Sequence, residues 1–169
     1  KNENLFPSKI LAAYDESILE LNSLEGKIRC IAHSAVIQNE KEYIPAGFVT
    51  LKFFTKSNLV SAKANDFSDI IHCLDITAET NKEYIKEREY FLSEASPDNS
   101  LIFIDGSMFS GASTSGNFIL IEQLLSKNCR PIFFVKNSES TIITERFEFA
   151  KGYNSDLHWA YVNLNPGEI

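Results

Sequence analysis

Most apolar residues of this 169-residue chain fall into short runs and alternating segments, and this pattern predicts several β-strands. Residues 27–38 alternate between apolar and polar positions, and residues 43–55 are rich in Phe, Val and Thr. The polar segment 39–42 between them fits the turn of an antiparallel hairpin. Residues 9–14 form an apolar run that meets an acidic segment. We interpret this run as a first strand, although its Leu and Ala residues also favour a helix.

The second half of the chain alternates between helix-like and strand-like segments. Residues 80–95 predict the clearest helix, because Thr80 and Glu83 match a capping box and Pro97 follows the last turn. The predicted segments after it are a strand at 101–104, a Gly/Ser-rich loop at 107–116, a helix at 117–126, a strand at 131–136 and a helix at 141–150. We expect residues 57–69 to be irregular and assign no type to 70–76.

This order of elements predicts the fold class. Three strands in a hairpin arrangement, followed by helix, strand, helix and strand, are typical of an RNase H-like α/β domain. Its mixed sheet contains antiparallel hairpin strands followed by parallel β-α-β units. A length of 169 residues suggests a single domain over residues 1–169. Because this fold places its first and fourth strands side by side, we expect Asp15 and Asp105 to be neighbours.

Composition narrows the possible functions. The formal net charge of −7 argues against nonspecific, electrostatically driven binding to nucleic acid. It does not exclude a metal-dependent nuclease, whose site is itself a cluster of carboxylates. No apolar run approaches the roughly 20 residues that cross a membrane. Cys30, Cys73 and Cys129 form no CxxC pair, so we expect free thiols and a cytoplasmic location.

The segment from Leu101 to Met108, Leu-Ile-Phe-Ile-Asp-Gly-Ser-Met, contains the first candidate for chemistry. Open α/β sheets bind their ligands at the carboxyl ends of strands, which is where we expect Asp105. A metal ion or water would stabilise its charge there. The alternative is a plain turn, because Asp-Gly and Asp-x-Ser are common turn sequences. The same alternative applies to Ser107.

Two-metal hydrolysis of a phosphodiester needs several converging carboxylates, and oxygen ligands suit Mg²⁺ or Mn²⁺. Asp15 and Asp105 would supply two ligands. We choose Glu89 as the third, because it shares a helix face with apolar residues, and keep Glu87 in reserve. The alternative for these glutamates is an ordinary solvated helix face.

Other polar residues have weaker cases. Lys136 ends a predicted strand and could contact a scissile phosphate, or it is simply a surface lysine. The loop 110–116 precedes a helix, where an anion could bind, but it lacks the P-loop pattern. We expect His33 and His72 to be packed strand residues. His158 is a less favoured candidate for a ligand or substrate contact.

Several segments resemble motifs of the NurA family of nucleases. The segment 101–108 is similar to the family's central Asp-Gly-Ser-Leu motif, and 12–17 is similar to its first motif, with Glu16 in place of a glycine. Residues 131–138 resemble the family's strand that ends in Lys. Residues 155–157 and 164–168 resemble its later Asp-Leu-Leu and Gly-Glu segments.

This resemblance implies an RNase H-like fold, manganese-dependent endo- and exonuclease action on DNA, and dimerisation. It also implies a HerA-type helicase-translocase partner in archaeal DNA end processing. By the same resemblance, Asp15, Glu89 and Asp105 would be metal ligands and catalytic residues, with Lys136 as a further catalytic residue and Asp156 as a further ligand. Family members are usually longer, so we expect a C-terminal truncation.

Three hypotheses follow. The first is a metal-dependent DNA nuclease. The second is a catalytically inactive RNase H-like protein that binds a protein partner or regulates an active nuclease, with dispersed carboxylates and an exposed aromatic patch. The third is a small-molecule-binding domain that uses the loop before the 117–126 helix.

Overall fold

The computed structural model describes residues 10–63, 69–109, 114–135 and 140–165. Its strands are β1 (Ile10–Ser23), β2 (Gly26–Asn39), β3 (Glu42–Thr55), β4 (Ile70–His72), β5 (Ser100–Asp105) and β6 (Arg130–Phe134). Its helices are α1 (Asn58–Lys63), α2 (Ile76–Ala95), α3 (Thr114–Ser126), α4 (Ile142–Arg146), a 3₁₀ turn (Glu148–Ala150) and α5 (Asp156–Asn163). The chain divides into two compact units, Lys1–Phe134 and Val135–Ile169.

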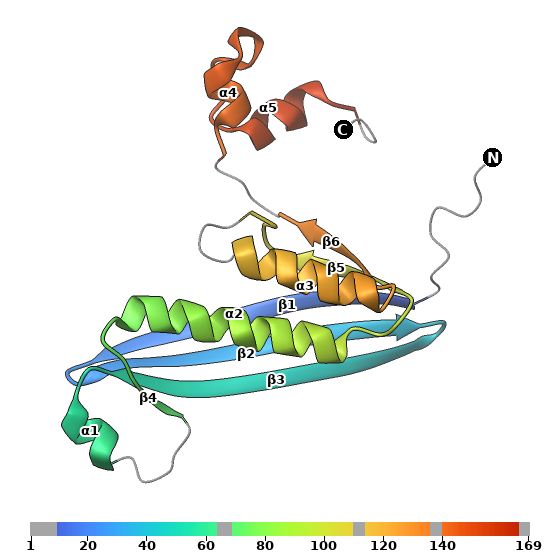
Figure 1. Cartoon of the computed structure of the whole chain (residues 1–169). Helices are drawn as coiled ribbons and strands as arrows, with labels where there is room; N and C mark the ends of the chain where they lie inside the picture. Colours follow the sequence, from blue (N-terminus) through green and yellow to red (C-terminus); the bar gives the residue numbers. More distant parts are fainter. Residues whose placement is uncertain (1–9, 64–68, 110–113, 136–139, 166–169) are drawn as a thin grey trace. The chain divides into compact units, whose positions relative to one another are not determined.

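The first unit contains a six-stranded sheet in the order β4-β3-β2-β1-β5-β6 (Figure 1). Strands β1, β2 and β3 pair antiparallel, whereas β5 is parallel to β1 and β6 is parallel to β5. The short β4 lies parallel to the outer edge of β3. This arrangement confirms the predicted RNase H-like α/β fold.

The three long strands are joined by tight turns. A Cβ atom added at Gly26, after the β1–β2 turn, would lie 2.0 Å from the carbonyl oxygen of Phe54 on β3. Only glycine therefore fits this point where two backbones approach closely. In the β2–β3 turn, Glu40 adopts a positive φ of 56°. The pairing register is continuous from Lys27 to Asn39 of β2 and from Glu42 to Phe54 of β3.

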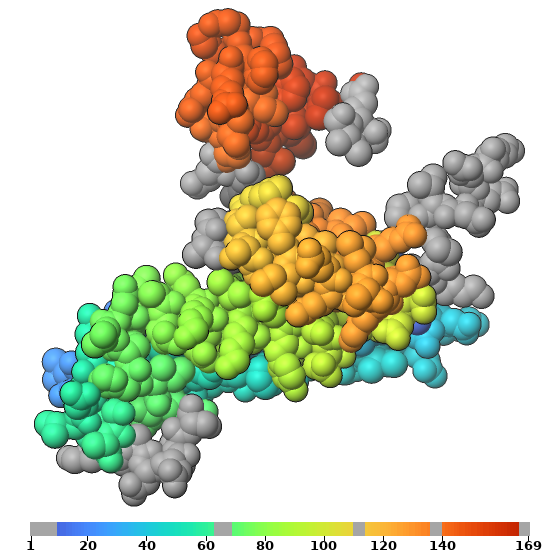
Figure 2. All heavy atoms as spheres, in the orientation of Figure 1, coloured from blue at the N-terminus to red at the C-terminus, as the bar shows by residue number. Residues whose placement is uncertain are grey.

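Helices α2 and α3 lie side by side over one face of the sheet (Figures 1 and 2). The core between them and the sheet consists of Ala12, Tyr14, Ala35, Phe91, Leu92, Ile102, Ile104, Leu120, Leu124 and Cys129. Each fully buried Leu or Ile contributes roughly 1.5–3 kcal/mol to folding. Alternation along β1 and β5 therefore decides which side chains can take part in a site on this face.

We call the opposite side of the sheet the open face. Residues that alternate with the core positions point to it, and several are large, apolar and exposed. They include Leu19, Leu21, Val36, Val49, Leu51 and Phe103. Contiguous exposed apolar surface of this kind is typical of interaction sites.

Helix α2 begins earlier than predicted. Its N-cap is Asp75, whose side chain accepts a hydrogen bond from the Ala78 N–H at 3.0 Å. The prediction that Thr80 caps the helix is therefore wrong, because Asp75, five residues earlier, caps the first turn. The Thr80 side chain is buried within the helix instead, where its hydroxyl donates to the Thr77 carbonyl.

Other elements also differ from the predictions. Strand β1 continues to Ser23, far beyond the apolar run that predicted it, because β2 pairs with it along its entire length. Helix α1 lies in a segment that we expected to be irregular, and α3 starts at Thr114 rather than at residue 117. His72 lies on β4 as expected but is exposed rather than packed.

The second unit contains α4, the 3₁₀ turn and α5, in a region where the sequence predicted one helix. Phe149 contacts both Phe147 and Trp159, with ring centroids 5.4 and 5.6 Å apart. The three cysteines are free, as expected. Within the described ranges, no helix has the length and apolar character needed to cross a membrane.

Candidate functional site

The two aspartates that the sequence singled out occupy adjacent strands. In the parallel pairing of β1 with β5, Tyr14 lies opposite Ile104, so Asp15 and Asp105 hold the next pair of positions. Asp15 is exposed and Asp105 is half-buried. Gly106, directly after β5, has a φ of +120°, a conformation that favours glycine, and its N–H donates to the Phe134 carbonyl of β6 at 2.9 Å.

Asp15 lies on the open face, in the interior of β1 rather than at its end. The side chain before it, Tyr14, packs against Phe91 of α2, with ring centroids 5.9 Å apart. Because successive side chains of a strand alternate, Asp15 points away from the helices. The Glu16 N–H donates to its carboxylate at 2.8 Å, which is a local contact.

Glu89, the predicted third ligand, lies between α2 and α3. A Cβ added at Gly116 of α3 would be 2.8 Å from Glu89 Oε1 and 2.4 Å from Ile85 Cγ2. Desolvation by burial raises the pKa of the Glu89 carboxyl. Glu89 is therefore on the helix side of the sheet, and the structure does not bring it together with Asp15.

The reserve candidate, Glu87, belongs to an ion-pair group with β3. Its carboxylate accepts from Thr50 Oγ1 at 2.9 Å and lies 2.6 Å from Lys52 Nζ. Lys52 also donates to Glu83 at 2.5 Å. Desolvation lowers the pKa of Lys52, but its hydrogen bonds to Glu83 and Glu87 outweigh this and raise it. This group fastens α2 to the sheet.

Of the remaining predicted site residues, Asp156 lies in the second unit. Lys136 and most of the loop 110–116 lie outside the described residues. The Asp156 carboxylate accepts from the N–H groups of Ile143 and Thr144 at 2.8 and 2.9 Å, and from Ser140 Oγ at 2.7 Å. Desolvation raises the pKa of Asp156, but these hydrogen bonds outweigh it and hold the pKa below its usual range. Asp156 therefore caps α4.

The structure reveals a polar group on the helix side that sequence reasoning missed. We call it the Glu16 cluster, and it consists of Tyr14, Glu16, His33, Tyr84 and Arg88. The Glu16 carboxylate accepts hydrogen bonds from the hydroxyls of Tyr14, at 2.5 Å, and of Tyr84. Arg88 Nε lies 3.6 Å from the same carboxylate. Alternation along β1 could have placed Glu16 beside Tyr14, but in the sequence it stood out only as a replacement for a motif glycine.

Arg88 links this cluster to the end of β5. Its side chain is buried, with only 5% of the residue exposed. Nη1 donates to Asn117 Oδ1 at 2.5 Å, and the guanidinium lies 5.7 Å from the centre of the Tyr14 ring. Asn117 in turn donates to the carbonyl of Met108 at 2.8 Å. A Cβ added at Gly106 would lie 3.9 Å from Arg88 Nη2. Arg88 therefore fixes the segment that follows Asp105.

His33 completes the cluster from β2 and is fully buried, as predicted for a packed residue. The single proton of the Tyr14 hydroxyl goes to Glu16, so hydrogen bonding assigns His33 Nδ1 as the donor to Tyr14 at 2.8 Å. Nε2 is then a buried acceptor without a described partner. Burial lowers the pKa of His33, so the ring is neutral at pH 7. Burial also raises the pKa of both tyrosines.

The described residues do not fit a two-metal centre. Such a centre needs several carboxylates around one point. Among the described residues, no group of three or more His, Cys, Asp or Glu side chains is placed to hold a metal ion. Asp15 and Glu89 lie on opposite sides of the sheet, and Glu16 already has two hydroxyl donors and a guanidinium beside it.

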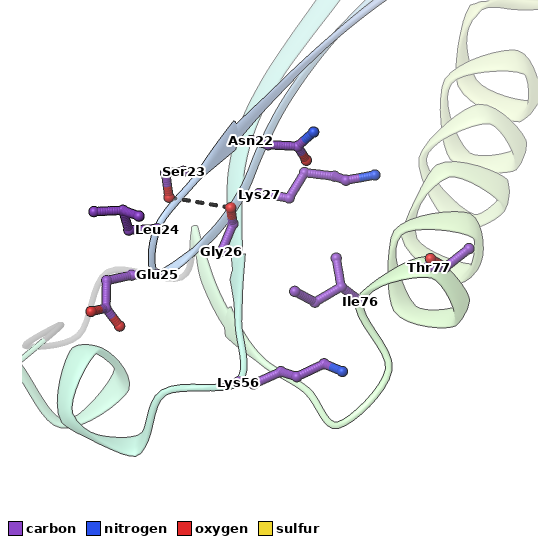
Figure 3. Close-up of a pocket in the computed structure, with 9 residues that line it drawn as sticks. All are labelled: Asn22, Ser23, Leu24, Glu25, Gly26, Lys27, Lys56, Ile76 and Thr77. Carbon is purple, nitrogen blue, oxygen red and sulfur yellow. Dashed lines mark hydrogen bonds between the residues drawn. The ribbon is translucent and has the colours of Figure 1, made fainter.

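A separate hollow of about 390 Å³ lies at the β1–β2 turn (Figure 3). The Lys27, Lys56 and Ile76 side chains line it, together with the turn itself. Lys27 Nζ forms an ion pair with Glu20 at 3.0 Å. None of the residues predicted for the site lines this hollow.

Comparison with known proteins is informative at the level of the fold. No protein-family model matches the chain, and no curated protein matches its sequence. Among solved structures, the chain is similar to the NurA nuclease from Sulfolobus solfataricus, with a TM-score of 0.51 and 12% sequence identity. The match covers 94% of this chain and 55% of that protein, so the chain spans about half of its length.

A structure of NurA with manganese also matches, at 12% identity over 60% of this chain and 20% of that one. Its TM-score is 0.28. The likeness at 12% identity shows the nuclease-like fold that the sequence motifs implied, and the chain's activity is a separate question.

Proposed function

We propose that the chain is a non-catalytic protein of this nuclease-like fold, which binds a protein partner instead of cutting DNA. The observation that carries the proposal is the position of Arg88. Its buried guanidinium lies beside Glu16 and near the carboxyl end of β5, where open α/β sheets bind their ligands. The chain therefore supplies its own fixed positive charge beside the Glu16 carboxylate, and no group of described carboxylates is placed to hold a metal ion.

The open face supports the binding part of this proposal. Leu19, Cys30 and Leu51 lie opposite one another across three strands and form an apolar row. Val49 and Leu51 have 66% and 60% of their surface exposed. A protein surface with apolar side chains would cover this row and gain roughly 25 cal/mol for each Å² removed from water.

The second candidate function is the metal-dependent DNA nuclease of the NurA kind. The adjacent positions of Asp15 and Asp105 favour it, because both carboxylates belong to one sheet face and could share a Mn²⁺ or Mg²⁺ ion. In this hypothesis the chain acts at DNA ends with a HerA-type translocase.

A cleavage assay separates the two functions. Wild type, Asp15→Asn and Asp105→Asn are incubated with labelled single- and double-stranded DNA in the presence of Mn²⁺ or Mg²⁺. We expect no cleavage above a no-protein control from any of the three. Metal-dependent cleavage by wild type that either variant abolishes would establish the nuclease and refute the proposal. Glu94→Gln, an exposed change on α2, serves as the matched control.

A further inference from the structure

The backbone groups at the outer edge of β3 show which of them can receive a further strand. Strand β4 pairs with β3 only at Phe53–Thr55, and the described part of the chain provides no strand beside residues 42–52 (Figure 1). The Phe53 N–H donates outward to the Asp69 carbonyl. Because alternate residues of a strand point the same way, Val49 and Leu51 also direct both their N–H and their C=O groups outward.

Proline limits the part of this edge that can form a continuous ladder. Pro45 has the same orientation as Val49 and Leu51 but no N–H to donate. The usable edge is therefore the part of β3 that follows Pro45 and precedes the position of β4. A short extended segment fits this length better than a strand that follows the whole of β3.

A groove lies beside this part of the edge, on the helix side of the sheet. It has a volume of about 530 Å³ and is formed by β3 and α2. The rings of Phe48 and Tyr90 line it, with centroids 6.0 Å apart, and Thr50 is a further lining residue. Residues directly opposite each other on paired strands lie on the same face. A side chain opposite Thr50 on an added strand would therefore enter the groove.

The charges around the groove favour a cationic segment. Asp69, Glu83 and Glu87 contribute three carboxylates to the lining, against the two ammonium groups of Lys52 and Lys86. Both lysines are already ion-paired with Glu83, so they do not favour an anionic segment. The chain as a whole carries a net charge of −7, which attracts cationic partners in the same way.

We propose that β3 binds an extended, cationic segment of a different protein as an added antiparallel strand. The segment's apolar side chain opposite Thr50 enters the groove, and its side chains opposite Val49 and Leu51 extend the apolar row of the open face. The residue opposite Phe48 is Arg or Lys, whose cation stacks on Tyr90, which is 60% exposed. Antiparallel pairing lets Val49 and Leu51 each exchange two hydrogen bonds with the segment.

This inference rests on the binding part of the proposed function and specifies the chemistry of the partner. Main-chain hydrogen bonds to the edge supply affinity, and the groove selects the side chain that enters it. It does not depend on whether the chain cuts DNA.

Titration of a model peptide into the isotope-labelled chain, followed by NMR, tests this mode of binding. The probe is acetyl-Thr-Val-Phe-Val-Arg-amide, whose phenylalanine takes the place opposite Thr50. We expect saturable shifts of the Val49 and Leu51 amide signals and slower hydrogen exchange of both, because these N–H groups gain acceptors. No saturable change at these two amides would overturn the proposal.

Two N-methylated forms of the peptide are the matched pair. Methyl groups on its second and fourth residues remove the N–H groups that face β3, whereas a methyl group on its phenylalanine removes one that faces away. We expect the first form to bind at least about tenfold more weakly than the parent peptide, and the second to stay within about threefold. Equal affinities of the two forms would refute strand addition even if the peptide bound.

Val49→Pro tests the same contact from the side of the chain. The substitution removes one outward N–H, and Pro45 shows that β3 accepts proline in this orientation. We expect Val49→Pro to weaken peptide binding by about tenfold, and Val49→Ala, which keeps the N–H, to weaken it by less. Equal losses in the two variants would contradict the proposed hydrogen bond. If circular dichroism shows that proline disturbs the sheet, the N-methylated pair decides alone.

Sedimentation equilibrium of the chain without peptide tests the alternative occupant, which is a second copy. We expect Val49→Pro to leave the measured mass unchanged. A mass that falls from two chains to one in this variant would show that a second copy occupies the edge, and would overturn the proposal. The cleavage assay above keeps its own outcome, so a failure here is distinct from a failure of the proposed function.

Discussion

Replacing Arg88 by methionine tests whether this guanidinium is the counter-charge of Glu16. Methionine keeps much of the volume of the buried side chain but removes its charge and its hydrogen bonds. The Glu16 side chain is 20% exposed, so it would keep its negative charge with little water to stabilise it. Asn117 Oδ1 would also lose its donor.

The expected loss follows from these contacts. Removing one partner of a buried ion pair typically costs about 3–5 kcal/mol of stability. We take the lost hydrogen bond to Asn117 as part of this cost and do not add it separately. Because Glu16 keeps both tyrosine hydroxyls as donors, we expect a loss of about 3 kcal/mol in the free energy of unfolding, at the lower end of this range. For a chain of this size each kcal/mol lowers the melting temperature by roughly 2–4 °C, which gives about 6–12 °C.

Urea denaturation of a double-mutant cycle measures the coupling. Arg88→Met, Glu16→Gln and the double variant are compared with wild type, and Lys82→Met, whose side chain is 71% exposed on the same helix, is the control. We expect the double variant to be more stable than Arg88→Met by at least about 1 kcal/mol, because no buried charge is left unpaired. A loss below about 1 kcal/mol for Arg88→Met, or additive single effects, would show that the two groups are not a pair.

Three further predictions concern other parts of the molecule. Gly116→Ala should lower the free energy of unfolding by about 1–3 kcal/mol in urea, because its Cβ would lie 2.4 Å from Ile85 Cγ2; an unchanged midpoint would contradict this. The free energy of unfolding should fall as the pH drops below about 6.5, because burial lowers the pKa of His33 and the unfolded chain binds its proton more readily. His33→Gln should flatten this profile between about pH 7.5 and 5.5, and equal slopes would exclude His33 as the cause. Asp156→Asn should speed amide hydrogen exchange at Ile143 and Thr144. In wild type, the protection of these amides should weaken as the pH falls below about 3.8, because the pKa of Asp156 is lowered in the folded chain. Protection that does not depend on residue 156 would refute the cap.

The sheet topology could be predicted because it depends on local patterns. Alternating residues predicted β2, and an apolar run predicted β5. The order of helices and strands then left few ways to connect these strands in one sheet. The length of β1 could not be predicted in the same way. Its second half, after Glu16, is largely exposed, and only pairing with β2 holds it in the sheet.

The candidate site depended on which face each side chain occupies, and this is a tertiary property. The sequence correctly placed Glu89 on the side of α2 that carries Ile85. That side packs against α3 rather than against Asp15, because two helices share one face of the sheet. The sequence did not indicate Arg88 as a site residue, because a buried arginine cannot be distinguished from an exposed one without its partners.

Manganese binding by the intact chain tests the central claim most directly. Isothermal titration calorimetry of Mn²⁺ into wild type and into Asp105→Asn would detect a metal site whether or not it supports cleavage. Arg88 already supplies the positive charge beside Glu16, and no group of described His, Cys, Asp or Glu side chains is placed to hold a metal ion. The account therefore predicts no saturable heat from either protein. Saturable binding by wild type that is lost in Asp105→Asn would contradict it and would place a metal centre at the carboxyl end of β5.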